Sequence, residues 1–236
     1  MIGSKRLARI AGVLYLAIIG FGIFAELLAR QAVFVAGDAA ATAANIVENS
    51  AMFRFGIAAD ILMALAYIGI GVALTRLFLD VDRSLARLIT VFATAGAAMI
   101  LVNLVFHAAA LEVATNPELA AQLGDENAGG LPLLFLTMHG LLYNLGGVFF
   151  GLWLLPAGLL IVRSGAFPAW LGYAVIVAAV LWLVVTIVHV VAPNLGSPWI
   201  DIIDLPTSIG EFWLALYLLT VGRRADHKIR QVPAAA

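Results

Sequence analysis

Six acidic or histidine side chains lie inside long apolar stretches of this 236-residue chain, one in each stretch. Such groups are costly within membrane-spanning helices, so they are expected to face a helix-bundle interior or a cavity. Because a helix rises ~1.5 Å per residue, all six are expected to lie roughly 5–12 Å below the helix ends on one and the same side of the membrane. The six residues are Glu26, Asp60, His107, His139, His189 and Glu211. We therefore expect them to share one polar pocket.

The residue types in this set are those of a metal centre. Three imidazoles with carboxylates nearby are a sufficient ligand set for Zn²⁺ or another divalent ion. The chain has no cysteine, which excludes thiolate ligands, iron–sulfur clusters and disulfides. A three-histidine site with an open position activates a bound water. We predict that the metal ligands are His107, His139 and His189, and that the catalytic groups are Asp60 and Glu211.

Further polar side chains are placed to support this site. Asn103 lies four residues before His107, so the two share a helix face. Tyr143 lies four residues after His139 and has the same relation to it. The supporting residues that we predict are Glu26, Asn103, Tyr143 and Asn144.

Each of these residues also has a simpler structural interpretation. Glu26 precedes Arg30 by four residues, which is the favourable order for an ion pair along a helix. The histidines can be neutral hydrogen-bonding links between helices. Asp60 is harder to explain in this way, because no basic residue lies within one turn and the nearest, Arg54, is six residues away.

The composition places these residues in a membrane protein. The chain is 64% hydrophobic and 11% charged, with a net charge of −1. A soluble domain is about 45–50% apolar and about 25% charged. The net charge also gives no basic surface for nucleic acid. We therefore expect an integral membrane protein whose surroundings are the lipid bilayer.

Apolar stretches of about 20 residues are long enough to cross a bilayer as helices. The stretches read from the sequence are 7–29, 52–79, 85–111, 133–162, 168–192 and 206–222. They leave no room for a separate soluble domain. We predict an all-α fold, a bundle of six transmembrane helices that forms one membrane domain over residues 1–236.

The basic residues predict the orientation of this bundle. Of the 13 Lys and Arg residues, only Arg30 and Arg54 fall on one side of the six spans. Because Lys and Arg accumulate on the cytoplasmic side, both termini are expected in the cytoplasm. Two loops on the opposite side carry helix signals. Asp38 is an N-cap before an Ala-rich helix, and Asn116 is an N-cap with Gly124 as the stop.

Several segments together resemble one family. They are ARIAGVLYL, Gly22–Glu26, GDAAATAANI, FRFGIAAD, SGAFPAWLG, and Pro206 with the Gly210–Glu211 pair. They resemble the bacterial membrane family catalogued as domain of unknown function 4386, over nearly the whole chain. The resemblance implies a multi-pass protein of the bacterial inner membrane, and it implies no established activity. By this resemblance, four residues match positions at which members of the family also tend to carry His or Glu: His107, His139, His189 and Glu211.

Three functions follow from these observations. The first is metal-dependent hydrolysis of a lipid or another amphiphilic small molecule that enters from the outer leaflet. The second is proton-coupled transport or sensing of a small solute by protonatable side chains. The third is a non-catalytic structural or partner-binding role, in which the polar layer only fixes the helix register. The sequence says nothing about oligomeric state.

Overall fold

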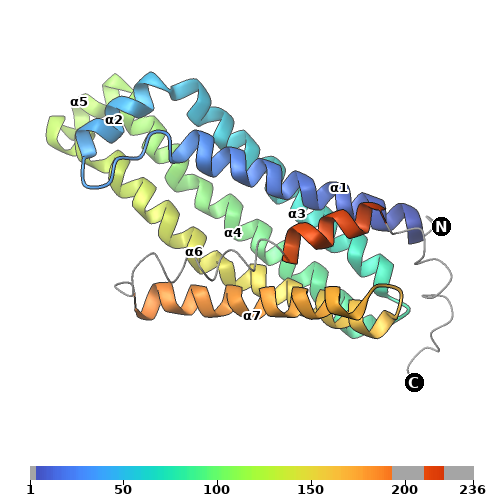
Figure 1. The fold of residues 1–236 in the computed structure, drawn as a ribbon. Coiled ribbons are helices and arrows are strands. Elements are labelled where there is room, and N and C mark those ends of the chain that lie inside the picture. Colours follow the sequence, from blue (N-terminus) through green and yellow to red (C-terminus); the bar gives the residue numbers. More distant parts are fainter. Residues whose placement is uncertain (1–3, 193–209, 221–236) are drawn as a thin grey trace. The chain divides into compact units, whose positions relative to one another are not determined.

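A computed structural model describes residues 4–192 and 210–220, and every regular element in these ranges is a helix (Figure 1). The elements are α1 (Ser4–Ile23), the π-helix η1 (Phe24–Arg30), α2 (Ala39–Glu48), α3 (Ser50–Phe78), α4 (Arg83–Thr115), α5 (Pro117–Leu123), α6 (Asp125–Ser164), α7 (Ala169–Val191) and a last helix over 210–220. The predicted all-α fold class is confirmed for the described residues.

Five of the described helices are long and apolar enough to cross a membrane. They cover Lys5–Arg30, Ser50–Phe78, Arg83–Thr115, Asn127–Ser164 and Ala169–Val191, and they coincide with the first five predicted spans. Of the predicted sixth span, 206–222, residues 210–220 are helical, and the rest lies outside the described residues. Length and composition therefore support a multi-pass membrane protein.

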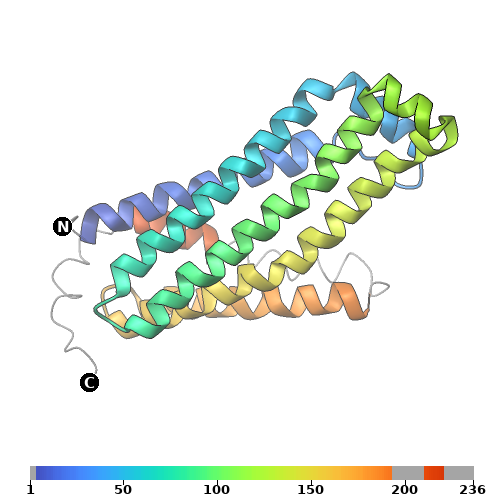
Figure 2. The same cartoon turned by 180° about the vertical axis from the view of Figure 1, so that it is seen from behind.

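The two short helices that the sequence signals predict are present. The Asp38 side chain accepts a hydrogen bond from the Ala41 amide at 2.9 Å, and α2 follows it. The Asn116 side chain accepts from two amides at the start of α5, and Gly124 ends that helix with a φ of 79°. Local capping chemistry explains both elements. Both lie at the same end of the helices that flank them, in Figure 1 and in the reverse view of Figure 2.

The contacts of the chain group it into two compact units, each built from separate segments. The first unit comprises Met1–Ala17, Leu65–Ala97 and Leu145–Ala236, and the second comprises Ile18–Ala64 and Ala98–Asn144. The boundaries fall within α1, α3, α4 and α6. The expectation of a single domain over residues 1–236 stays a prediction.

Glycines let α6 and α7 approach closely in the first unit. A Cβ on Gly158 would lie 2.9 Å from the Gly172 carbonyl oxygen, and a Cβ on Gly172 would lie 2.8 Å from the Gly158 carbonyl oxygen. A Cβ on Gly151 would lie 2.7 Å from the carbonyl oxygen of Ala179. Small residues at such contacts allow direct packing of helix backbones, which stabilises helix pairs in membranes.

The second unit has an apolar core around Phe53, whose side chain is fully buried. The buried residues of this cluster are Val33, Ile46, Phe53, Ala110, Leu111 and Leu136. Gly56 lies one turn from Phe53 on α3, where a Cβ would meet the Ala29 Cβ at 2.6 Å and the His107 ring at 3.2 Å. The absence of a side chain at Gly56 therefore brings η1 and His107 close to α3.

The sequence did not predict the π-helix η1. Its widened turn is closed by the Gln31 amide, which donates to the Glu26 carbonyl oxygen, five residues back, at 2.9 Å. π-helical turns are rare and frequently occur at functional sites. This one contains both Glu26 and Arg30.

Candidate functional site

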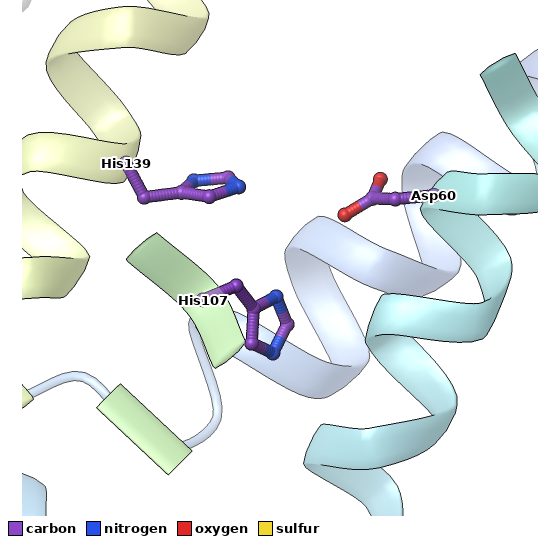
Figure 3. Close-up of side chains that lie close together, drawn as sticks. All are labelled: Asp60, His107 and His139. Atoms are coloured by element: carbon purple, nitrogen blue, oxygen red, sulfur yellow. The ribbon is translucent and has the colours of Figure 1, made fainter. Parts of the chain in front are cut away.

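Three of the predicted site residues meet in the second unit. Asp60 extends from α3, His107 from α4 and His139 from α6, and the side chains point toward one another (Figure 3). One ligand atom from each residue lies within 4.8 Å of the others, and all three side chains are buried. Three separate helices thus place one carboxylate and two imidazoles around a common point.

Arg30 contributes a fourth buried side chain to this cluster. Its Nη1 donates a hydrogen bond to Asp60 Oδ2 and lies 3.4 Å from His107 Nδ1. Its Nε donates to Glu26 Oε2 at 2.9 Å. The Arg30 side chain is 6% exposed and that of Glu26 is 45% exposed. The guanidinium therefore bridges a buried carboxylate and a carboxylate that reaches the surface.

The contacts of His107 define the role of each of its ring nitrogens. Nε2 lies 3.1 Å from the carbonyl oxygen of Phe53. Because a carbonyl only accepts hydrogen bonds, Nε2 carries the proton in this contact. In the neutral ring, Nδ1 then holds the lone pair, and this lone pair faces Arg30. The Phe53 ring packs against the imidazole, with a centroid distance of 4.0 Å.

His139 is fixed by neighbours on α4 and α6. The side-chain amide of Asn103 donates to the His139 carbonyl oxygen at 3.0 Å. The His139 ring lies edge-on to that of His107, with centroids 5.8 Å apart. It stacks on Tyr143 at 6.4 Å. Asn144 follows on α6 and is half-buried. The predicted supporting residues Asn103 and Tyr143 therefore contact His139.

Two buried oxygen atoms at the site have no hydrogen-bond partner within the described part of the chain. They are Oδ1 of Asp60 and Oδ1 of Asn103. Buried polar atoms are nearly always paired, so an open acceptor needs an explanation. Carboxylate and amide oxygens can take a hydrogen-bond donor or a cation. The site thus has an unused carboxylate oxygen beside two imidazoles.

The structure assigns the other two predicted residues, His189 and Glu211, to the first unit. His189 Nδ1 lies 3.1 Å from the carbonyl oxygen of Val185, in its own helix α7. His189 is not part of the group formed by Asp60, His107 and His139. A metal site with three histidine ligands stays a prediction.

Glu211 has its own set of partners in the first unit. The Tyr15 hydroxyl donates to Oε2 at 2.7 Å, and the Trp182 indole N–H donates to Oε1 at 2.6 Å. Each of the two donor side chains also packs against another aromatic ring. The ring centroids of Tyr15 and Trp153 lie 5.5 Å apart, and those of Trp182 and Phe150 lie 5.2 Å apart. These contacts fasten the helix over 210–220 to α1 and α7.

The Tyr15→Phe variant tests this link. It removes the only polar atom of a side chain that is 1% exposed, and it takes one donor from Glu211. Leaving a part-buried acceptor without its donor is expected to lower the free energy of unfolding by about 1–3 kcal/mol. The measurement is unfolding with SDS in mixed micelles. Tyr173→Phe is the control, because Tyr173 is 59% exposed and its variant should match the wild type. Equal stability of the two variants would contradict the prediction.

The ion pair between Glu26 and Arg30 that the spacing predicts is confirmed, whereas the spacing did not predict that Arg30 also pairs with Asp60. A buried carboxylate with no basic residue on its own helix requires one from another helix. Arg30 was the basic residue nearest to the predicted pocket, four residues from Glu26. That combination is the signal that could have identified it.

The family described as domain of unknown function (DUF4386) matches residues 10–222. No curated protein and no solved structure matches the chain.

Proposed function

The chain belongs to the DUF4386 family, and from this premise and the site geometry we propose that it is a divalent-metal-binding membrane protein that hydrolyses a lipid or another amphiphile. The observation that carries the proposal is the convergence of Asp60, His107 and His139 from three helices. The proposal includes six membrane-spanning helices, cytoplasmic termini and the bacterial inner membrane. The distribution of Lys and Arg along the sequence supports this orientation.

The donor set suits a divalent ion. Two histidines and one carboxylate are ligands of catalytic Zn²⁺ and of non-haem Fe²⁺. Atoms bound to one ion at ~2.1 Å can lie up to about 4.2 Å apart. In a tetrahedral site three such ligand atoms lie ~3.4 Å apart. The ligand atoms here lie within 4.8 Å of one another, so metal binding would bring pairs of them closer by up to ~1.4 Å. Asp60 Oδ1 is unpaired among the described residues, and the His107 lone pair points into the site.

Three protein ligands leave a coordination position for water, which is the basis for proposing hydrolysis. The substrate class follows from the surroundings of the site. Leu27 and Leu28 beside Glu26, and Ile61 and Leu62 beside Asp60, are exposed large apolar side chains. In a bilayer such side chains contact lipid, so an amphiphilic substrate can reach the helices that carry the site.

Metal content tests the proposal directly. The protein is purified in detergent, stripped with a chelator, reloaded separately with Zn²⁺, Fe²⁺ or Mn²⁺, and analysed for metal per chain. We expect one ion per wild-type chain and at least a tenfold loss of affinity in His107→Ala and His139→Ala, because each removes one of three ligands. His189→Ala is the matched control and should keep its metal. Wild-type protein without stoichiometric metal would overturn the proposal.

The same preparations separate the two parts of the proposal. Metal-loaded and stripped protein are compared in vesicles that contain ester-linked and amide-linked lipids, and released products are measured. Metal-dependent product formation supports hydrolysis. If metal binds and no lipid is cleaved, the hydrolase part is wrong and the metal site stands. If His189→Ala also loses its metal, the three-histidine ligand set replaces the one proposed here.

A structural role is the second candidate, because Arg30 already pairs with Asp60. The ion pair joins η1 to α3, and the contact of His107 with the Phe53 carbonyl joins α4 to α3. A purely structural cluster binds no metal. In that case substitutions of Asp60, His107 or His139 would change only the stability of the protein. The measurement of metal per chain distinguishes this role from metal binding.

A further inference from the structure

We propose that Arg30 is an internal competitor for the metal site and that Glu26 retains its guanidinium when a metal ion enters. The inference rests on the proposed metal-binding function and adds a specificity-determining residue, Arg30, and a positioning residue, Glu26. Its basis is the placement of one guanidinium between a half-exposed carboxylate and the buried ligand atoms.

Arg30 and a metal ion compete for the same lone pair. Nε2 of His107 is engaged with the Phe53 carbonyl, so Nδ1 is the nitrogen that can bind a metal. Arg30 Nη1 lies 3.4 Å from this atom. A Zn²⁺ ion would lie ~2.0–2.1 Å from it, in the direction that the guanidinium now fills. The guanidinium has to withdraw before His107 can act as a ligand.

Charge makes this withdrawal obligatory. Arginine stays protonated in proteins, so Arg30 carries a full positive charge. In a buried site with little solvent to screen it, a second cation in contact with the guanidinium is strongly repelled. Arg30 and a divalent ion therefore exclude each other from the position next to His107.

Glu26 gives the withdrawn guanidinium a partner. Its Oε2 already accepts from Arg30 Nε at 2.9 Å, four residues along the same segment. Its side chain is 45% exposed, so it lies on the path from the buried site to the surface. Arg30 can thus lose its contact with His107 and keep an ion pair.

The Arg30 guanidinium sets a minimum affinity that a metal ion must have to enter the site. Without metal, the guanidinium neutralises Asp60 and occupies the lone pair of His107. An incoming ion must bind the imidazoles strongly enough to displace it. Na⁺ and K⁺ bind imidazole poorly, whereas Zn²⁺ and Fe²⁺ bind it well. Arg30 therefore selects for divalent transition metals.

A double-mutant cycle tests the competition. Zn²⁺ affinity is measured by chelator competition for wild-type protein, Glu26→Gln, Arg30→Met and the double variant, with Glu48→Gln as control. Arg30→Met should bind Zn²⁺ about tenfold tighter or more, because the competing cation is gone. Glu26→Gln should bind it about tenfold weaker, because the displaced guanidinium loses its partner. Glu48 lies exposed on α2, so Glu48→Gln should match the wild type.

The double variant provides the decisive comparison. With Arg30 absent, the Glu26 substitution should have no further effect, so the double variant should match Arg30→Met. Circular dichroism and size exclusion show whether each variant is folded; if Arg30→Met is not, the comparison of Glu26→Gln with Glu48→Gln decides. A wild-type affinity in Glu26→Gln, or no tightening in a folded Arg30→Met, overturns this inference alone. Absence of Zn²⁺ binding in wild type and all variants overturns the proposed function and this inference with it.

Discussion

The Asp60→Asn variant is expected to unfold with a free energy about 3 kcal/mol below that of the wild type, because breaking a buried ion pair leaves the buried side of the Arg30 guanidinium without its carboxylate. Asp60 is 2% exposed and Arg30 is 5% exposed, so water cannot replace the lost partner. Glu26 stays paired with Arg30 through Nε, but Nη1 loses its carboxylate. Unfolding with SDS in mixed micelles measures the difference.

Asp82→Asn is the matched control for this variant. Asp82 pairs with Arg163 at 2.9 Å, and the two side chains are 29% and 55% exposed. The same chemical change at an exposed pair should cost less than about 1 kcal/mol. Adding Arg30→Met to Asp60→Asn should cost less than the sum of the two single changes, because no buried unpaired charge is left. Equal losses in Asp60→Asn and Asp82→Asn would show that Asp60 is solvated.

Gly158→Ala is the second variant with a large expected effect. The added Cβ would lie 2.9 Å from the carbonyl oxygen of Gly172 and 3.0 Å from the Ile176 amide nitrogen. Both atoms belong to the backbone of α7, so relief requires the two helices to separate. Overpacking of this kind is expected to lower the free energy of unfolding by about 1–3 kcal/mol, measured by the same SDS titration.

The same substitution elsewhere on α6 should have the opposite sign. A Cβ at Gly140 meets no described atom within 4 Å. Gly140→Ala therefore adds no clash and removes the entropy cost of glycine in a helix, which is expected to stabilise by about 0.5–1 kcal/mol. Destabilisation by Gly140→Ala, or tolerance of Gly158→Ala, would contradict the account of α6 and α7 packing.

The sequence predicts the helices well because the determinants are local. Apolar length predicts the five described helices that are long and apolar enough to cross a membrane, and the N-caps Asp38 and Asn116 predict α2 and α5. The sequence also predicts part of the arrangement of Asp60, His107 and His139. Each is a polar residue at a similar depth in an apolar helix, so all three are expected to face the bundle interior at the same level.

Long-range contacts account for what the sequence could not predict. Arg30 is 30 residues from Asp60, and Tyr15 is 196 residues from Glu211, so no local pattern joins either pair. That Glu211 lies with the histidines stays a prediction; among the described residues its hydrogen bonds go to Tyr15 and Trp182 in the first unit. Depth along a helix predicts which residues are level, and it does not give their direction around the helix axis.

The widened turn of η1 predicts where sequence alignments with homologues would contain a one-residue gap. A turn closed five residues back holds one residue more than an α-helical turn. It is equivalent to one extra codon within Phe24–Arg30. Deleting that codon would restore a regular helix and leave the residues after it facing as they do now, because the widened turn absorbs the extra residue. A gap in an alignment within Phe24–Arg30 would therefore mark a homologue that has a regular helix at this turn and whose residue at the Arg30 position still faces Asp60.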